Sequence, residues 1–409
     1  MLYQPTSPTI KVRVANWAKN IKSSMLQEML SVASKPGILS FALGLPAPEL
    51  FPSSQMAQAA TQVLSDDAQA LQYGPPYRPL KAQIVAMMRQ RGVDCREEQI
   101  LITGGAQQGM NLLTRLLLNP GGQVVVEKLT YTGFHQILEQ FQPGILTVPT
   151  DYNSGIDVES IEKLLRRGAR PALIYVITDG HNPLGVSLSL DKRIRLVKLA
   201  RQYCVPIIED DAYGLLNYDN KHLPPLRALD EDFVFYIGSF SKILAPGLRV
   251  GWLIVPESLI PRLSIIKEAT DINTSTFAHR VVSAYLAAGH LEGHLTALRR
   301  EYRVRRDIMI NALREHFPCS ARWHEPTSGV FIWVELNEGV DTIMLLKTAV
   351  EEEQVAFIPG AALSVTPSRR YDNCIRLNFS NCAPEFIKEG IARLARVSEK
   401  CGRNISCHH

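Results

Sequence analysis

The chain has 409 residues, 46% of them hydrophobic, and its 44 basic side chains nearly balance its 40 acidic ones. A formal net charge of +4 gives no reason to expect nucleic acid or an anionic membrane as a partner. No apolar run approaches the ~18 residues of a membrane-spanning helix, and the N-terminus lacks the pattern of a signal peptide. The seven cysteines include no CxxC pair, so neither a disulfide framework nor a metal site is indicated. We expect a cytoplasmic protein long enough for two domains.

Short apolar runs alternate with amphipathic stretches along most of the chain. In chain order, the patterns predict a helix at 19–32, strands at 37–41 and 100–102, a helix at 106–118, strands at 124–126 and 173–177, a helix at 190–203, and strands at 205–208, 234–237 and 251–255. Helical periodicity covers 277–316, and a smaller α+β segment follows with strands at 330–334, 355–358 and 374–379 and helices at 342–353 and 384–400. Short apolar strands separated by helices are typical of a mostly parallel sheet covered on both faces, so we predict an α/β fold. In such sheets ligands bind beyond the carboxyl ends of the strands.

A lysine follows one of these strands. Lys242 comes after the apolar run at 234–237 and a polar turn, and Arg249 lies farther along the chain. An unpaired buried ammonium is costly, whereas Schiff-base chemistry needs a neutral, partly desolvated amine. The hydroxyls of Ser239 and Ser241 and the guanidinium of Arg249 suit a phosphate dianion. The alternative is a solvated surface lysine beside a turn.

A group of acidic residues follows another strand. Asp210 lies at the end of the apolar run at 205–208, and Tyr213 is three residues later. A carboxylate there can pair with a pyridinium nitrogen, which keeps such a ring protonated and able to accept electrons. The phenol could hydrogen-bond an oxygen on the same ring. The alternative is an acidic helix N-cap, which many proteins carry.

A glycine-rich turn separates the strand at 100–102 from the helix at 106–118. Its glycines, Gly104 and Gly105, would let the backbone at Ala106 and Gln107 approach a phosphate at the helix N-terminus. No Walker lysine follows, so a P-loop is not indicated. A tight strand-to-helix turn without a ligand is the alternative.

An arginine, Arg376, interrupts the apolar strand at 374–379. A buried arginine needs a partner, and a substrate carboxylate held by both arms of the guanidinium would be one. An internal ion pair with an acidic side chain of the protein is the alternative.

Together these motifs resemble the class I/II aminotransferases, which are pyridoxal 5′-phosphate (PLP) enzymes. The resemblance is strongest to the branch of 2-aminoadipate and kynurenine aminotransferases, and it extends from about residue 19 to residue 398. It includes the stretches 39–52, 71–76 and 359–360. The joint occurrence of Asn182, Asp210, Lys242 and Arg249 in that order carries it.

The resemblance implies the aspartate-aminotransferase fold (PLP fold type I), with a mostly parallel seven-stranded sheet in a large domain and a smaller α+β domain. The large domain is expected at 51–286 and the small domain at 287–400, with 1–50 joining the small domain and 401–409 forming a tail. One long helix at about 278–316 is expected to bridge the domains. A homodimer is expected, with Tyr73 reaching the phosphate in the neighbouring subunit.

The resemblance also assigns catalytic roles. Lys242 would hold PLP as a Schiff base and move a proton between substrate and cofactor, and Asp210 would bind the protonated pyridine nitrogen. Tyr213 and Asn182 would hydrogen-bond the ring hydroxyl oxygen, and Tyr131 would stack on the ring.

The remaining implied roles concern two anionic groups, the phosphate of the cofactor and the α-carboxylate of the substrate. The phosphate would be held by the backbone at Ala106 and Gln107 and by the side chains of Ser239, Ser241 and Arg249. Arg376 would take the substrate α-carboxylate, with Gly44 and Asn182 lining the substrate site.

The chain departs from the family pattern at several positions. Thr178, His181 and Leu184 stand where proline, glutamine and threonine are usual, which alters the wall near Asn182. His181 could carry a proton near the ring or could replace the hydrogen-bonding glutamine. Leu43 replaces a glycine and should narrow the substrate pocket with an apolar group. At position 27, Gln27 replaces the arginine with which 2-aminoadipate-type relatives help bind an acidic side chain, so an apolar or aromatic donor is favoured.

The leading hypothesis is therefore ping-pong transfer of an amino group from an amino acid to a 2-oxo acid. The alternative on the same fold is decarboxylation, oxidation or elimination of an amino acid. A non-catalytic PLP sensor fused to a DNA-binding domain is disfavoured, because only 43 residues precede Gly44 and no basic face is apparent.

Overall fold

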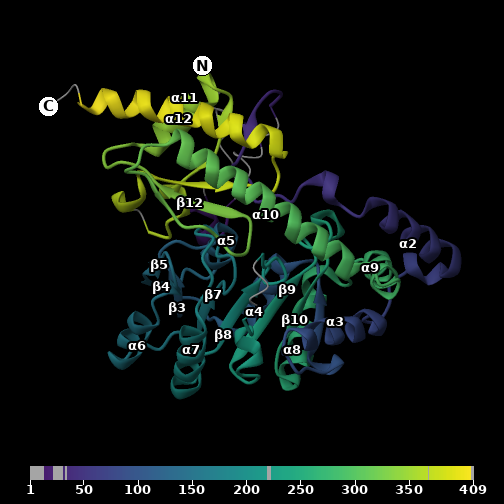
Figure 1. Cartoon of the computed structure of the whole chain (residues 1–409). Coiled ribbons are helices and arrows are strands. Elements are labelled where there is room, and N and C mark those ends of the chain that lie inside the picture. Colours follow the sequence, from purple (N-terminus) through teal and green to yellow (C-terminus); the bar gives the residue numbers. More distant parts are fainter. Residues whose placement is uncertain (1–12, 22–30, 33–34, 219–222, 367, 407–409) are drawn as a thin grey trace.

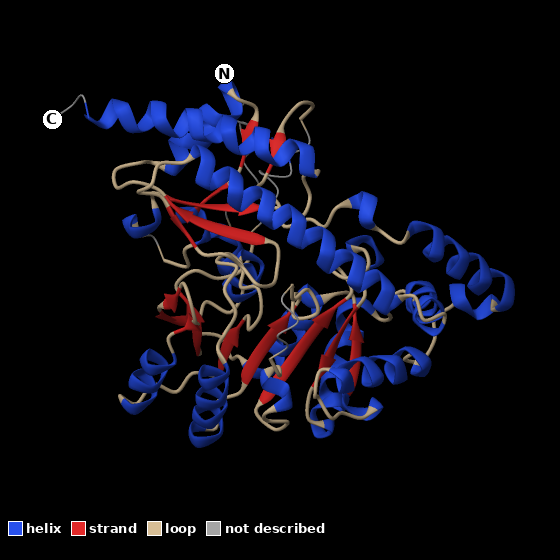
Figure 2. Cartoon of the chain, in the orientation of Figure 1, coloured by secondary structure: helices blue, strands red, loops and turns tan. Residues whose placement is uncertain are grey.

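The computed structural model describes residues 13–21, 31–32, 35–218, 223–366 and 368–406. The predicted helix at 19–32 and the departure at Gln27 therefore lie wholly or largely outside the described residues. Most of the described strands belong to a large sheet or to a smaller one, with helices packed around both sheets, and two further pairs of short strands lie outside them (Figures 1 and 2). Among the described residues, no helix is both long and apolar enough to cross a membrane.

The large sheet has seven strands in the order β2-β10-β9-β8-β7-β3-β4. Neighbouring strands run parallel except β10, which is antiparallel to both β2 and β9. This confirms the predicted mostly parallel sheet. The strands are β2 (Ile100–Thr103), β3 (Gln123–Glu127), β4 (Gly144–Val148), β7 (Leu173–Val176), β8 (Ile207–Asp211), β9 (Val234–Ser239) and β10 (Gly251–Ile254). The sequence patterns missed β4, because an edge strand that is largely half-buried lacks a continuous apolar signal.

Both faces of the large sheet are buried. In β3, Val124 and Val126 pack into one apolar cluster with helices α4, α5 and α8, whereas Val125 packs into another with α6 and α7. Successive side chains of a strand point to opposite faces, so a strand covered on both sides must be apolar throughout. The helices are α4 (Ala106–Leu117), α5 (Thr132–Glu139), α6 (Val158–Arg166), α7 (Leu190–Tyr203) and α8 (Ile260–Asp271). A small hairpin, β5 (Thr150–Asp151) and β6 (Gly155–Ile156), precedes α6.

The smaller sheet is antiparallel, with the order β11-β12-β15-β14. Its strands are β11 (Arg322–Trp323), β12 (Phe331–Glu335), β14 (Ile358–Pro359) and β15 (Cys374–Asn378). Helices α10 (Leu291–His316), α11 (Thr342–Glu352) and α12 (Pro384–Ser406) accompany this sheet in the upper half of Figure 1. Strand β1 (Leu39–Ser40) pairs in parallel with β13 (Val355–Ala356), so the N-terminal segment adjoins this part of the chain.

Two sequence predictions about elements were wrong. The predicted strand at 355–358 is two strands, because β13 pairs with β1 whereas β14 pairs with β15. The expected long helix at 278–316 is divided into α9 (Thr276–Ala287) and α10. Gly289 lies between them with φ +75°, a left-handed conformation that ends helices and that glycine adopts at little cost. Helices α2 (Ser53–Asp66) and α3 (Arg78–Gln90) pack beside α9.

A buried arginine fixes the loop between β7 and α7. The side chain of Arg193, fully buried on α7, pairs with Asp179 at 2.7 Å. It also donates to the carbonyl oxygens of Leu188 (2.9 Å), Pro224 (2.9 Å) and Thr178 (3.1 Å). These bonds hold both ends of the segment that carries Asn182.

We expect Arg193→Ala to lower the free energy of unfolding by roughly 3–5 kcal/mol, because it removes one partner of a buried ion pair and leaves several carbonyl oxygens without their hydrogen-bond donor. Arg195→Ala, on the same helix, is the control, because the Arg195 side chain is 53% exposed and pairs with Glu162 at 3.3 Å. Its effect should stay below about 1 kcal/mol. Urea denaturation of both variants checks this, and equal losses would contradict the role given to Arg193.

Candidate active site

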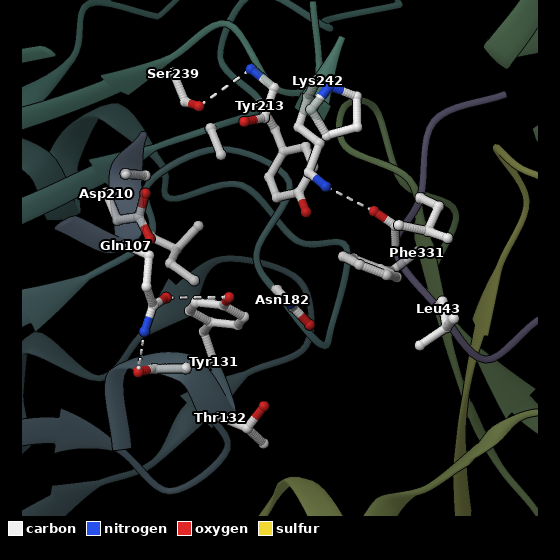
Figure 3. A pocket seen from close by; sticks show the side chains of 18 of the residues that line it. Leu43, Gln107, Tyr131, Thr132, Asn182, Asp210, Tyr213, Ser239, Lys242 and Phe331 are labelled. Carbon is white, nitrogen blue, oxygen red and sulfur yellow. Dashed lines mark hydrogen bonds between the residues drawn. The ribbon is translucent and has the colours of Figure 1, made fainter. Parts of the chain in front are cut away.

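A cavity of about 270 Å³ lies between the carboxyl ends of the large-sheet strands and the face of the smaller sheet. Asp210, Gln107 and Tyr131 line one side of it, and Lys242, Phe331 and Leu43 line the other (Figure 3). The structure brings all the predicted site residues to this cavity except Tyr73. Those that line it are Gly44, Ala106, Gln107, Tyr131, Asn182, Asp210, Tyr213, Ser239, Ser241, Lys242, Arg249 and Arg376.

Asp210 lies near the end of β8 with one carboxylate oxygen committed and one free. The hydroxyl of Tyr175 donates to Oδ2 at 2.7 Å. Oδ1 is buried and has no hydrogen-bond partner among the described residues. Burial raises the pKa of Asp210 to about 6, with the charge of Asp211 adding to the increase and the bond from Tyr175 opposing it. A free buried carboxylate oxygen facing a cavity is suited to a cationic N–H donor.

Lys242 follows β9, and its ammonium group donates to the carbonyl oxygen of Gly44 at 2.7 Å (Figure 3). Burial, and then the positive charges of Arg376 and Arg249, lower the pKa of Lys242 to about 8. Removal from water and like charges both favour the neutral amine. The structure therefore excludes the alternative of a solvated surface lysine.

Arg249 and the first turn of α4 form a cradle with free N–H groups. Arg249 Nη2 donates to the carbonyl oxygen of Gly104 at 2.7 Å, and Gly105 has φ +99° just before the helix. A Cβ added at Gly105 would lie 2.7 Å from Arg249 Nη2, so only glycine lets the guanidinium come so close. Ser239 and Ser241 line the same cavity. A helix N-terminus with an adjacent guanidinium is a site for a phosphate dianion.

Tyr131 lies directly before α5 and is fixed by Gln107. Its hydroxyl donates to Gln107 Oε1 at 3.3 Å, and Gln107 Nε2 donates to the carbonyl oxygen of Gly133 at 2.8 Å. Burial, followed by the charge of Asp210, raises the pKa of Tyr131. The ring is thus held at one wall of the cavity as a neutral phenol.

Arg376, on β15, enters the cavity from the smaller sheet. It donates to Asn182 Oδ1 at 2.8 Å and to the carbonyl oxygen of Ala42. Its guanidinium lies 4.3 Å from the centre of the Phe331 ring, and its buried Nε has no hydrogen-bond partner in the described part of the chain. No acidic side chain within the described residues pairs with it, so the alternative of an internal ion pair is not supported. Burial lowers the pKa of Arg376 to about 10, which leaves it a cation at neutral pH.

Tyr213 and Tyr73 differ in their placement. Tyr213 is buried against Phe331, with the two rings edge-on and their centres 5.9 Å apart, and burial raises its pKa. Tyr73 is 74% exposed and does not line the cavity. The chain as described does not use Tyr73 at its own site.

The altered loop turns its unusual side chains away from the cavity. Thr178 donates to Glu209 at 3.0 Å, and the Nε2 of His181 lies 2.9 Å from a carboxylate oxygen of the buried Glu127. Leu184 lines a second cavity together with Trp333. Of the residues that line the active-site cavity in the described part of the chain, none is Thr178, His181 or Leu184, so the expected alteration beside Asn182 lies on the side that does not face this cavity. Leu43, by contrast, does line the active-site cavity.

The sequence analysis missed several residues that matter to the site. The ring of Phe331 packs against the guanidinium of Arg376, and the hydroxyl of Tyr175 donates a hydrogen bond to Asp210. Both lie inside apolar strands, where a residue in contact with a site and a core residue give the same pattern. The only available signal for Tyr175 was a hydroxyl in a strand otherwise predicted to be buried on both faces.

Comparisons with known proteins agree with this geometry. The family model of aminotransferase class I and II matches residues 37–394. Aromatic-amino-acid aminotransferase 1 of Thermococcus litoralis is 37% identical over 93% of this chain and 92% of its own. The crystal structure of Pyrococcus horikoshii kynurenine aminotransferase, in complex with PMP and kynurenine, superposes with a TM-score of 0.89 at 35% identity, covering 95% of this chain and 97% of that one. That of Thermus thermophilus alpha-aminoadipate aminotransferase, complexed with N-(5′-phosphopyridoxyl)-L-leucine, also gives 0.89 at 34% identity over 96% and 98% of the two chains.

The chain belongs to the class I and II aminotransferases, and its cofactor is PLP. The residues present fit this group. The free Oδ1 of Asp210 can accept from a protonated ring nitrogen, and the close approach of Arg249 to Gly105 leaves a cradle for the phosphate. PLP-dependent transfer of amino groups, the predicted activity, is thereby confirmed at the level of the family.

We expect Gly105→Ala to weaken PLP binding by about tenfold or more, because the added methyl group would displace the Arg249 guanidinium from the cradle. Gly121→Ala is the control, since Gly121 also has a positive φ but a Cβ there meets open space. Fluorescence titration of the apoproteins measures both dissociation constants. Unchanged affinity in Gly105→Ala would contradict this account of the cradle.

Proposed function

We propose that this aminotransferase takes its amino group preferentially from apolar or aromatic amino acids. The lining of the cavity carries the proposal. Its cationic side chains, among the described residues, are Lys242, Arg249 and Arg376, and each faces a different part of the reaction site. The remaining space is bordered by the apolar side chains of Leu43, Leu45, Phe331, Ile358 and Leu363. An acidic donor would leave its distal carboxylate buried without a counterion, which is costly.

We further propose the following roles for the two ends of the substrate and cofactor. The N–H groups at Ala106 and Gln107, with Ser239, Ser241 and Arg249, bind the phosphate. Arg376 binds the α-carboxylate of the substrate, exchanging its bonds to Asn182 and Ala42 for a two-armed contact. Gly44 borders the substrate, since it lines the cavity, and a Cβ there would lie 2.5 Å from the Phe331 ring.

PLP, when bound, supplies an aldehyde that reacts with amines and a ring that accepts an electron pair. Lys242 would supply the amine that holds the cofactor and, once released, would take the proton from the substrate Cα and deliver it to C4′ of the cofactor. Asp210 keeps the ring nitrogen protonated. Asn182 and Tyr213 hydrogen-bond the ring hydroxyl oxygen, and Tyr131 covers one face of the ring.

The proposed active form is a homodimer. Tyr73 is 74% exposed and does not line the cavity of its own chain. Both facts are consistent with donation of its phenol to the site of a second copy. The cytoplasmic location and the domain boundaries at 51–286 and 287–400 likewise remain predictions from the sequence.

The donor is tested by adding amino acids one at a time to the purified holoenzyme without an acceptor. We expect phenylalanine, leucine and similar amino acids to convert the visible cofactor band with a second-order rate constant at least about tenfold above that of glutamate or 2-aminoadipate. This ratio corresponds to ~1.4 kcal/mol of discrimination. Addition of a 2-oxo acid should restore the band. Preference for the acidic donors would overturn the proposal, and release of carbon dioxide or consumption of oxygen would favour the alternative chemistry on the same fold.

The pKa of Lys242 predicts how cofactor attachment depends on pH. The neutral amine attacks the aldehyde, and its fraction increases as the pH rises through about 8 rather than through the ordinary value of 10.5. The rate at which the apoenzyme recombines with PLP should therefore level off above about pH 9. Stopped-flow absorbance measures this, with N-acetyl-lysine amide as the control amine. A rate that follows the control up to pH 10 would contradict the lowered pKa.

A further inference from the structure

The tyrosine beneath Asp210 lies in the neighbouring strand and belongs to none of the motifs that define the site. Tyr175 of β7 is opposite Ile208 of β8 in the parallel register, and Asp210 is two residues farther along β8. Because strand side chains alternate with a period of two, Asp210 and Ile208 point to the same face as Tyr175. The Tyr175 hydroxyl thereby reaches Asp210 Oδ2 at 2.7 Å.

The ring of Tyr175 is held rigidly. It stacks on Phe134 of α5 with ring centres 3.9 Å apart and planes inclined by 10°, and Tyr175 is only 1% exposed. Burial, followed by the charge of Asp210, raises the pKa of Tyr175 well above its usual value. The phenol therefore stays protonated and can only donate to the carboxylate.

This single bond decides how the two oxygens of Asp210 are used. Oδ2 is committed to Tyr175, whereas Oδ1 is buried and has no partner among the described residues. A hydrogen bond to the charged form of an acid favours that form. Without the phenol, the carboxylate could rotate, and it would take up a proton more readily in this buried position.

We infer that Tyr175 is a positioning residue that aims Asp210 Oδ1 at the ring nitrogen of PLP and keeps the carboxylate ionised. The inference rests on the proposed role of Asp210. It assigns to Tyr175 no contact with the cofactor, so its effect should be confined to interactions that involve the ring nitrogen.

The next strand supplies a matched control. Tyr236 of β9 is opposite Glu209, and its hydroxyl donates at 2.9 Å to Asp211 Oδ2, again two residues farther along β8. Tyr236 is also 1% exposed. Asp211, however, does not line the cavity and is paired with Arg91. Tyr236→Phe therefore removes the same group from the same kind of partner and leaves the hydrogen bond to Asp210 in place.

The test compares the binding of PLP with that of an analogue in which a C–H group replaces the ring nitrogen. Dissociation constants for apoprotein are measured by fluorescence for the wild type, Tyr175→Phe and Tyr236→Phe. We expect the wild type and Tyr236→Phe to prefer PLP over the analogue to the same degree, and Tyr175→Phe to lose about tenfold of this preference. Affinity for the analogue itself should change little, because the phosphate cradle is intact.

The pH dependence provides a second readout that a purely structural role would not change. The preference for PLP requires ionised Asp210, so it should fall as the pH is lowered through the pKa of that carboxyl group. In Tyr175→Phe the midpoint of this fall should move to higher pH, and in Tyr236→Phe it should stay where it is in the wild type. In the double variant Tyr175→Phe, Asp210→Asn, the preference should equal that of Asp210→Asn alone.

Each outcome has a distinct meaning. Equal preference in the wild type and Tyr175→Phe would overturn the inference about Tyr175, as would equal losses in Tyr175→Phe and Tyr236→Phe. A wild type that does not distinguish PLP from the analogue would instead overturn the role proposed for Asp210. If Tyr175→Phe does not fold, Phe134→Leu decides the matter, since it leaves both polar groups but removes the ring that fixes Tyr175. A smaller loss of preference would then support the inference, and wild-type preference would overturn it.

Discussion

A carboxylate buried at the end of a central parallel strand imposes the main constraint on this molecule. An isolated charge in such a place is costly, and ordinarily the group would be neutralised or paired. Asp210 receives one hydrogen bond from Tyr175, its other oxygen has no partner among the described residues, and the charge of Lys242 favours the ionised carboxylate. The fold thus stabilises the ion only in part. In the role proposed for Asp210, a cofactor with a protonated ring nitrogen would complete the stabilisation, which would link affinity for the cofactor to the same feature that activates it.

Two of the cationic side chains that line the cavity, Lys242 and Arg376, are also largely buried, and burial makes their charged forms less stable. Burial lowers the pKa of Lys242 to about 8, with the charges of Arg376 and Arg249 adding to the decrease, and burial alone lowers the pKa of Arg376 to about 10. Among the described residues, neither cation has an acidic side chain in contact. Their bonds are to carbonyl and amide oxygens, which stabilise a cation less than a carboxylate does. A bound anion can therefore replace the carbonyl and amide oxygens that now accept hydrogen bonds from Lys242 and Arg376. A lysine with a pKa near 8 can also act as a nucleophile and as a proton carrier at neutral pH.

The departures from the family pattern in the loop at 178–186 now have a physical account that does not involve the substrate. His181 lies against Glu127, and Thr178 donates to Glu209. Arg193 donates to the carbonyl oxygens of Thr178 and Leu188, at the two ends of the loop between β7 and α7. These contacts form a buried polar network behind the loop that carries Asn182. Among the substituted positions that the structure describes, Leu43 lines the cavity with an apolar side chain.

The sequence by itself determined the strands of the large sheet, apart from β4, and about half of the residues that line the cavity. It could do so because continuous apolar runs report burial on two faces and because Lys242, Asp210, Arg249 and Arg376 are costly wherever they have no function. Only the tertiary structure decided which strands pair. The β7–β8 register brings Tyr175 to Asp210, and the separate pairing of β13 and β14 divides the predicted strand at 355–358. Likewise, which side of the loop faces the cavity depends on contacts between segments far apart in the chain, such as His181 with Glu127. Periodicity records whether a side chain is buried, whereas the identity of its partner is set by the packing of distant segments against one another.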